Sequence, residues 1–227
     1  MVLSQAEATR LSGQTVPPLY LSSLTAAGTL FVYGADRWLE RKALAQLANR
    51  HLGLPWVNVL FIIVIATLTL MALPHCTLPD FVWLGMLGVL GLLYLLTTIG
   101  RIPAVPALKE CLGAACFAVL VWGRVASGFN LMMIGFYFMA LSNFLWSSHQ
   151  DRQRDAMNGI RSLSVRYPVF NIWLARVFAL LACGLLLVPA PKSVFVITGL
   201  LLACWPKHQK ASIDLTFLPL LAVPFLI

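Results

Sequence analysis

The sequence predicts an all-α protein: a polytopic transmembrane helix bundle that forms a single integral membrane domain over residues 1–227. Of its 227 residues, 60% are hydrophobic and 11% are charged, whereas soluble domains carry about 25% charged residues. The apolar residues form runs that approach the roughly 17–25 residues needed to cross a bilayer as a helix. No alternation typical of a membrane β-barrel is present, and helices satisfy their own backbone hydrogen bonds in lipid.

Eight candidate spans follow one another along the chain. They cover residues 16–37, 55–74, 79–99, 106–124, 129–148, 169–188, 193–205 and 212–227. The last two are short and are accompanied by Pro206, Pro219 and Pro224, so seven spans is the competing count. Residues 1–15 form a polar N-terminal segment, and the polar stretches at 38–54 and 149–168 are too short for a soluble domain.

Basic residues predict the orientation. The net charge of +8 would suggest a nucleic-acid partner in a soluble protein, but here it lies in the gaps between apolar runs and suits anionic lipid head groups. One set of loops and helix ends holds Arg37, Arg41, Lys42, Arg50, Arg101, Lys109, Arg152, Arg154, Arg161, Arg166, Lys207 and Lys210. The opposite side holds Arg10, Arg124 and Lys192. The positive-inside rule makes the first side cytoplasmic, and we expect a multi-pass protein of a bacterial inner membrane whose N-terminus starts outside.

Two pairs of acidic residues end predicted helices on this cytoplasmic side. Asp36 and Glu40 form one pair, and Asp151 and Asp155 form the other. Residues four apart share one face of a helix. Because Mg²⁺ prefers oxygen ligands and is often held by one or two carboxylates plus substrate phosphates, the four acids are candidate magnesium ligands. The alternative is that they form interfacial ion pairs with Arg37, Arg41, Arg152 or Arg154.

The face that carries Asp151 and Asp155 continues into the membrane. Stepping back four residues at a time gives Ser147 and then Asn143. Polar side chains inside a span usually face a cavity or a partner. We therefore expect one polar stripe running into the membrane, made of Asn143, Ser147, Asp151 and Asp155.

Residues 151–166, DRQRDAMNGIRSLSVR, resemble the second aspartate-rich motif of the UbiA superfamily of intramembrane prenyltransferases. Residues 32–40, VYGADRWLE, look like a degraded first motif of that family: Asp36 keeps the central aspartate, Glu40 replaces the last one, and Val32 and Tyr33 stand where the motif opens with Asn and Asp. The stretch at 101–110 is similar to the family's basic segment between the motifs. The resemblance covers about residues 16–227, as helices two to nine of the family's nine.

The resemblance implies a Mg²⁺-dependent transfer of an isoprenyl group from a polyprenyl diphosphate to an aromatic or other lipophilic acceptor. It implies a catalytic role for Asp36, Asp151 and Asp155, with Glu40 as a further metal ligand. Lys109, Arg101 and Arg161 are candidates for binding the diphosphate, with Lys109 matched to the basic segment. Asn143 and Arg41, beside the acidic motifs, are further candidates for cofactor binding. The implied partners are the donor, the acceptor, membrane lipids and a further membrane protein, with no nucleic acid.

Three other functions stay open. A catalytically silent UbiA-like scaffold or complex subunit is favoured by Val32 and Tyr33 in the first motif. A UbiA-type terpene cyclase or diphosphate hydrolase would need the same metal site and no acceptor. A transporter is disfavoured, because no pair of Gly/Pro-broken helices occupies matched positions in two halves.

Three further features each have two interpretations. His149 is either a surface residue or a partner of the acidic cluster. The run rich in methionine and aromatic residues at 129–144 either forms a lipid-facing or packing surface or lines an isoprenoid tunnel. Tyr137 within it is either a packing residue or a cavity residue.

Overall fold

The computed structural model describes residues 20–31, 55–98, 107–123, 131–157, 162–189 and 194–204. Every regular element in these segments is helical, which confirms the all-α prediction for that part of the chain. A helix spans residues 20–31. The elements that follow are α3 (Pro55–Ala72), η1 (Leu73–His75), α4 (Leu78–Thr98), α5 (Leu108–Trp122), α6 (Leu131–Met157), α7 (Leu163–Arg166), α8 (Pro168–Leu187) and α9 (Val194–Ala203).

Most helix bounds agree with the apolar runs. The ends of α3, α4, α5, α8 and α9 fall within about two residues of the predicted spans, because hydropathy and helix formation end together in lipid. Helix α6 differs: the predicted apolar span ends at residue 148, and the helix continues through the acidic pair to Met157. Its extension is polar but contains Gln, Arg, Ala and Met, which favour helix in water as well. The predicted span at 212–227 lies outside the described residues.

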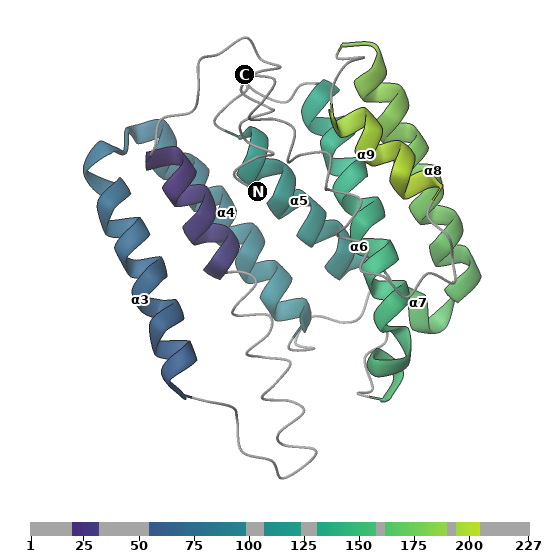
Figure 1. Cartoon of the computed structure of the whole chain (residues 1–227), viewed down its shortest axis with the longest axis horizontal. Helices are drawn as coiled ribbons and strands as arrows, with labels where there is room; N and C mark the ends of the chain where they lie inside the picture. Colours follow the sequence, from purple (N-terminus) through teal and green to yellow (C-terminus); the bar gives the residue numbers. More distant parts are fainter. Residues whose placement is uncertain are drawn as a thin grey trace.

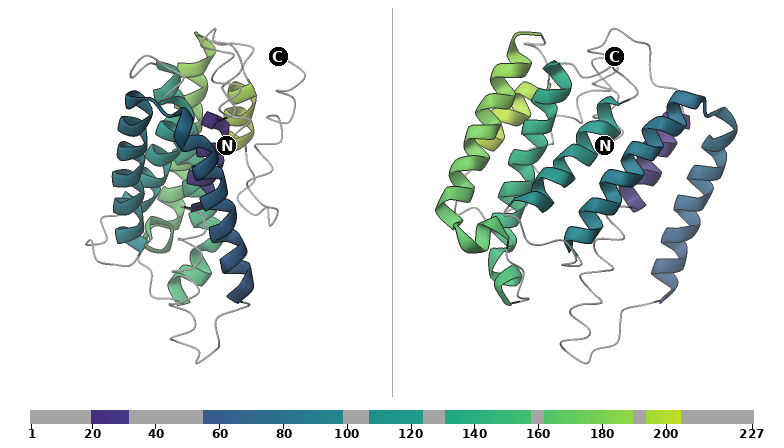
Figure 2. Two further views of the ribbon diagram at one scale, coloured as in Figure 1. Left: turned by 90° about the vertical axis from the view of Figure 1, so that its left-hand side faces the viewer. Right: turned by 180° about the vertical axis from the view of Figure 1, so that it is seen from behind.

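The long helices are arranged in a layer. Helices α4, α5, α6 and α8 stand side by side, as seen from behind in Figure 2. Helix α4 packs on α5, and α6 packs on α5, α7, α8 and α9. The helix at 20–31 and α9 lie on the same face of this layer, called here the front face, which is turned towards the viewer in Figure 1. Gly28 contacts Leu120 of α5, because a Cβ at Gly28 would lie 3.4 Å from Leu120 Cδ1.

Successive long helices run in opposite directions, so the bundle has two distinct ends. The η1 end, at the top of Figure 1, holds η1, the start of α4 and the ends of α5 and α8. The α7 end holds the end of α4, the start of α5, the end of α6 and α7. This alternation agrees with consecutive membrane crossings.

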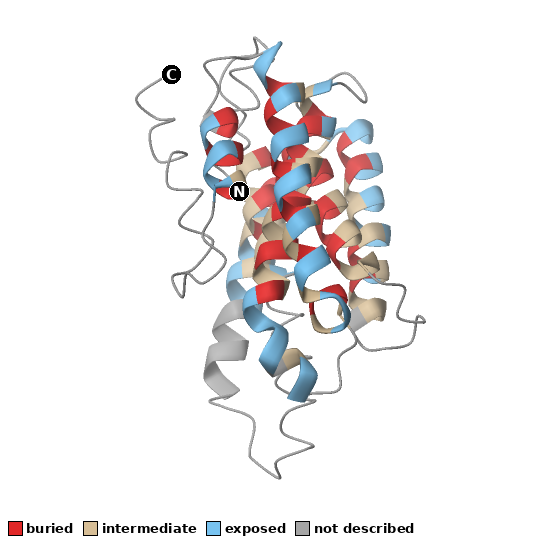
Figure 3. Cartoon of the chain, turned by 90° about the vertical axis from the view of Figure 1, so that its right-hand side faces the viewer, coloured by how far each residue is buried: buried red, intermediate tan, exposed pale blue. Residues whose placement is uncertain are grey.

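Three helical stretches in the described part of the chain are long and apolar enough to cross a membrane: Leu78–Thr97, Leu131–Gln153 and Pro168–Leu187. Helix α8 has an outer face of exposed apolar side chains, among them Phe170, Trp173 and Leu180, and the outward-facing ribbon in Figure 3 shows this exposure. A large exposed apolar surface of this kind is consistent with lipid contact. Helix α5 has only 15 residues and rises about 22 Å, less than the roughly 30 Å of a hydrocarbon core.

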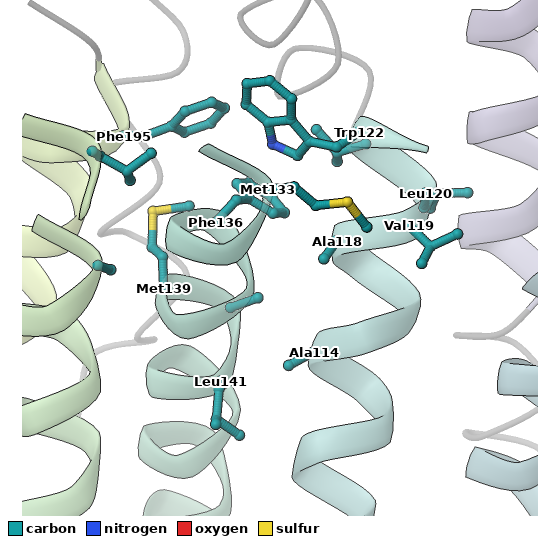
Figure 4. Close-up of a cluster of buried hydrophobic side chains, with 14 of the residues drawn as sticks. Ala114, Ala118, Val119, Leu120, Trp122, Met133, Phe136, Met139, Leu141 and Phe195 are labelled. Atoms are coloured by element: carbon teal, nitrogen blue, oxygen red, sulfur yellow. The ribbon is translucent and has the colours of Figure 1, made fainter. Parts of the chain in front are cut away.

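An aromatic and methionine cluster fills the bundle between α5, α6 and α9 towards the η1 end (Figure 4). Phe136 and Phe195 pack edge to face with their ring centroids 5.1 Å apart, and the Trp122 ring lies 6.4 Å from Phe195. Met133 and Met139 are buried in the same cluster. Packing is therefore the role of these members of the run at 129–144.

Helix α4 is fixed at the η1 end by hydrogen bonds at its first turn and by a hydrogen bond to α5. Asp80 Oδ2 accepts hydrogen bonds from Thr77 N, at 2.7 Å, and from Thr77 Oγ1, at 2.6 Å. The Asp80 carboxylate thereby satisfies a backbone donor ahead of the helix, as in a capping box. Trp83 then donates from Nε1 to the Val119 carbonyl of α5 at 2.7 Å, which joins the two helices.

Candidate functional site

The second acidic motif lies on the last turns of α6, at the α7 end. Asp151 is exposed and Asp155 is half-buried. Ser148, Asp151 and Asp155 follow at intervals of three and four residues, so they lie on one face of the helix. Both carboxylates also lie near a helix C-terminus, where the macrodipole is negative and favours cations. A cation beside these acids would therefore be stabilised both by their charge and by the helix.

The upper part of the polar stripe points towards the front face. Phe144 faces α5, where its ring packs edge to face on Phe117 with centroids 5.3 Å apart, while Trp146 faces α9 and donates to the Leu202 carbonyl at 3.0 Å. At about 100° per residue, Asn143 and Ser147 project between these two directions. Asn143 Oδ1 is buried and has no hydrogen-bond partner within the described segments. An amide oxygen in that state favours a polar ligand or a water.

Lys109 occupies the first turn of α5, at the same end as the second motif. Its ammonium group lies 5.5 Å from the centroid of the Tyr94 ring. A Cβ on Gly113 would lie 2.9 Å from Phe144 Cε1, so Gly113 of α5 and Phe144 of α6 lie at the same height along the bundle. Lys109 is four residues before Gly113, about 6 Å nearer the α7 end. Lys109 and Leu120 are eleven residues apart, three turns of helix, so Lys109 also lies on the front side of α5.

Glu110 was not predicted as a site residue. It is buried, with 5% of its surface exposed, in the first turn of α5 beside Lys109. Its position near a helix N-terminus stabilises a carboxylate. The signal available in the sequence was an acidic residue directly after the basic stretch at 101–109, at the start of an apolar run.

Three serines join α7 to α6, and we call Ser148, Ser162 and Ser164 the serine clamp. Ser164 Oγ donates to the Ser148 carbonyl at 2.8 Å. The Ser164 hydroxyl also lies 2.9 Å from the Ser148 hydroxyl and 2.9 Å from the Ser162 hydroxyl. Because the Ser164 proton is used on the carbonyl, Ser164 Oγ accepts from the other two with its two lone pairs. The motif sequence contained two of these serines, but it gave no reason to pair them with Ser148.

A second polar contact ties α8 to α6 one turn earlier. Asn171 is fully buried and donates from Nδ2 to the Leu145 carbonyl at 2.7 Å. His149 is also buried and lies edge to face with Trp146, with centroids 6.3 Å apart. The surface interpretation of His149 is therefore wrong, since burial on the helical interface removes this side chain from solvent.

The remaining predicted site residues, Asp36, Glu40, Arg41, Arg101 and Arg161, lie outside the described residues. Within the part of the chain that the structure describes, no three side chains of His, Cys, Asp or Glu gather as a metal-binding group. The site as described is thus two carboxylates on α6 and a lysine on α5, at the same end of the bundle.

Comparison of the chain with protein-family models, with curated proteins and with solved structures finds no match in any of the three. The chemistry of the residues themselves therefore carries the functional inference.

Proposed function

We propose that this protein is a Mg²⁺-dependent intramembrane prenyltransferase that acts on a polyprenyl diphosphate. The observation that supports this most is the end of α6: Asp151 and Asp155 share one helix face at the bundle end where Lys109 begins α5. Residues 151–166 also resemble the second motif of the UbiA superfamily. Two carboxylates and a basic residue match the needs of a magnesium diphosphate, because Mg²⁺ is commonly held by few protein ligands and by substrate phosphates.

Each described residue has a distinct task in this proposal. Asp151 and Asp155 would hold Mg²⁺, which when bound neutralises charge on the diphosphate. Lys109 would bind a diphosphate oxygen as a point charge. The bond between the allylic carbon and the diphosphate oxygen breaks, and the diphosphate leaves with the electron pair. A nucleophilic carbon of the acceptor then bonds to the allylic cation and loses a proton to water. Electrostatic stabilisation of the leaving group is the main contribution of the protein.

The proposal includes an orientation. Lys109, Arg152 and Arg166 all lie at the α7 end, which the positive-inside rule places in the cytoplasm. The donor would thus present its diphosphate to the cytoplasmic side and leave its isoprenoid chain in the membrane, in a multi-pass protein of about eight spans. Arg161, Arg101, Asp36, Glu40 and Arg41 would complete the site from segments outside those described.

Purified protein in detergent tests this proposal directly. We expect Mg²⁺-dependent pyrophosphate release from geranyl or longer prenyl diphosphates in the presence of quinone-type acceptors. Asp151→Asn and Asp155→Asn should each reduce release by about 100-fold, because each removes charge that stabilises the leaving group. Gln153→Ala is the matched control: it changes an exposed residue on the same turn of α6 and should leave release unchanged.

A second candidate, a catalytically silent scaffold, is favoured by Val32 and Tyr33 at the opening of the first motif. The same assay separates the two. Absence of pyrophosphate release with every donor and acceptor pair would reject the enzyme and leave the scaffold. Release without any acceptor, accompanied by a cyclic or hydrolysed isoprenoid product, would assign the site to a cyclase or hydrolase.

A further inference from the structure

We infer that the serine clamp is a positioning group that fixes the acidic end of α6, and this inference rests on the proposed function of Asp151 and Asp155. Ser148 precedes Asp151 by three residues and Asp155 by seven. The clamp therefore contacts α6 on the helix face that carries both carboxylates. Its contact point, Ser148, lies within two turns of each of them.

The hydrogen bonds of the clamp meet at one atom, Ser164 Oγ, and have ordinary lengths. Ser164 Oγ donates to the Ser148 carbonyl at 2.8 Å and lies 2.9 Å from each of the other two hydroxyl oxygens. Ser164 is fully buried. Removing Ser164 Oγ would end all three contacts together, because each of them passes through this one atom.

The end of α6 needs an anchor of this kind. Residues 150–153 are exposed, and the last four carbonyls of any helix have no partner within it. A helix end with few packing contacts opens readily. Asn171 holds the Leu145 carbonyl and Ser164 holds the Ser148 carbonyl, so two successive turns of α6 are tied to the α7–α8 segment.

A metal site loses affinity when its ligands are mobile, because binding must then order them. Loosening the helix end should weaken Mg²⁺ binding while the reaction at saturating Mg²⁺ stays nearly as fast. A variant that only destabilises the fold behaves differently: it lowers the amount of active protein and leaves the Mg²⁺ dependence unchanged.

The experiment compares Ser164→Ala, Ser162→Ala and Ser142→Ala in the full chain in detergent. Ser142 is a matched control, because it is a fully buried serine on α6 whose hydroxyl has no hydrogen-bond partner in the described part of the chain. We expect the Mg²⁺ concentration for half-maximal pyrophosphate release to rise about fivefold in Ser164→Ala. It should rise less in Ser162→Ala and stay unchanged in Ser142→Ala. The maximal rate should change less than about twofold.

Amide hydrogen exchange provides a readout that does not depend on activity. We expect faster exchange at residues 151–157 in Ser164→Ala, with residues 131–140 and the Ser142→Ala protein unchanged. Unchanged exchange at 151–157 would overturn the clamp, whatever the activity. So would faster exchange with an unchanged Mg²⁺ dependence in a protein that releases pyrophosphate. Absence of release in the wild type would instead reject the proposed function, and hydrogen exchange alone would then decide whether the clamp holds α6.

Discussion

Two acidic residues of this protein, Asp80 and Asp155, lie at opposite ends of helices and therefore meet helix dipoles of opposite sign. Asp80 lies at a helix N-terminus, where the macrodipole favours it and Thr77 donates two hydrogen bonds to it. Asp155 lies in the last turn of α6, where the dipole disfavours a carboxylate. Their positions on the helices differ: Asp80 caps α4, whereas the proposed function gives Asp155 a cation that would offset the dipole at the end of α6.

Asp80→Ala should therefore destabilise the fold and leave the chemistry intact. We expect a loss of about 1 kcal/mol in unfolding free energy, typical of a lost helix cap, with the Mg²⁺ dependence of pyrophosphate release unchanged. Burial, and then the Asp80 carboxylate, raise the pKa of the Cys76 thiol. Removing the carboxylate lowers that pKa, so more thiolate is present at pH 8 and alkylation of Cys76 should accelerate. A stable variant with slower alkylation would contradict the cap.

The serines and Asn171 show why part of the site could not be predicted. The spacing of Asp151 and Asp155 and the polar stripe through Asn143 are local patterns, so both can be predicted from the sequence. Ser164 and Ser148 are sixteen residues apart, and Asn171 and Leu145 are twenty-six apart. Their pairing depends on where the chain turns between α6 and α8, which hydropathy does not encode.

At the level of elements, the contact between α5 and α6 depends on a glycine. A Cβ at Gly113 would lie 2.9 Å from the Phe144 ring, and that ring is itself packed on Phe117. We expect Gly113→Ala to lower the unfolding free energy by about 1–3 kcal/mol, the usual effect of overpacking. The start of α5 should shift with it, and Lys109 would move away from the second motif, so that pyrophosphate release falls as well.

Gly88→Ala in α4 is the control for this substitution, since nothing lies within 4 Å of a Cβ there. It should be neutral or stabilise the protein by up to about 1 kcal/mol, because alanine favours a helix more than glycine does. Thermal unfolding in detergent measures both variants. Equal effects of the two substitutions would show that the α5–α6 contact is not tight at Gly113.

At the level of the whole molecule, the alternating helices predict which residues meet which aqueous compartment. Gln153 lies at the α7 end and Val188 at the η1 end, and both are exposed. In a background with the native cysteines replaced, we expect a membrane-impermeant maleimide to label Gln153→Cys only from the cytoplasmic side. Val188→Cys should be labelled only from the other side. Labelling of both from one side would reject the crossing order between α6 and α8.

The helical architecture could be predicted because long apolar runs are typical of membrane spans, and a backbone in hydrocarbon must bond to itself, which favours helices. The relative order of the helices in the layer has no such rule, and neither does the placement of α9 over α6. Within the described residues, part of the Met and aromatic run is core. Phe136 of this run packs on Phe195, which lies fifty-nine residues later in the chain.

The length of α6 has a consequence for charge. Its 27 residues extend about 40 Å, whereas the hydrocarbon layer is about 30 Å thick. If Leu131 lies at one boundary of that layer, Asp151 lies about 30 Å away, at the other. An anion bound to Asp151 by a bridging cation would then remain among hydrated head groups. The cost of moving a charge into hydrocarbon would not arise, while an apolar tail attached to that anion could stay dissolved in lipid beside α6.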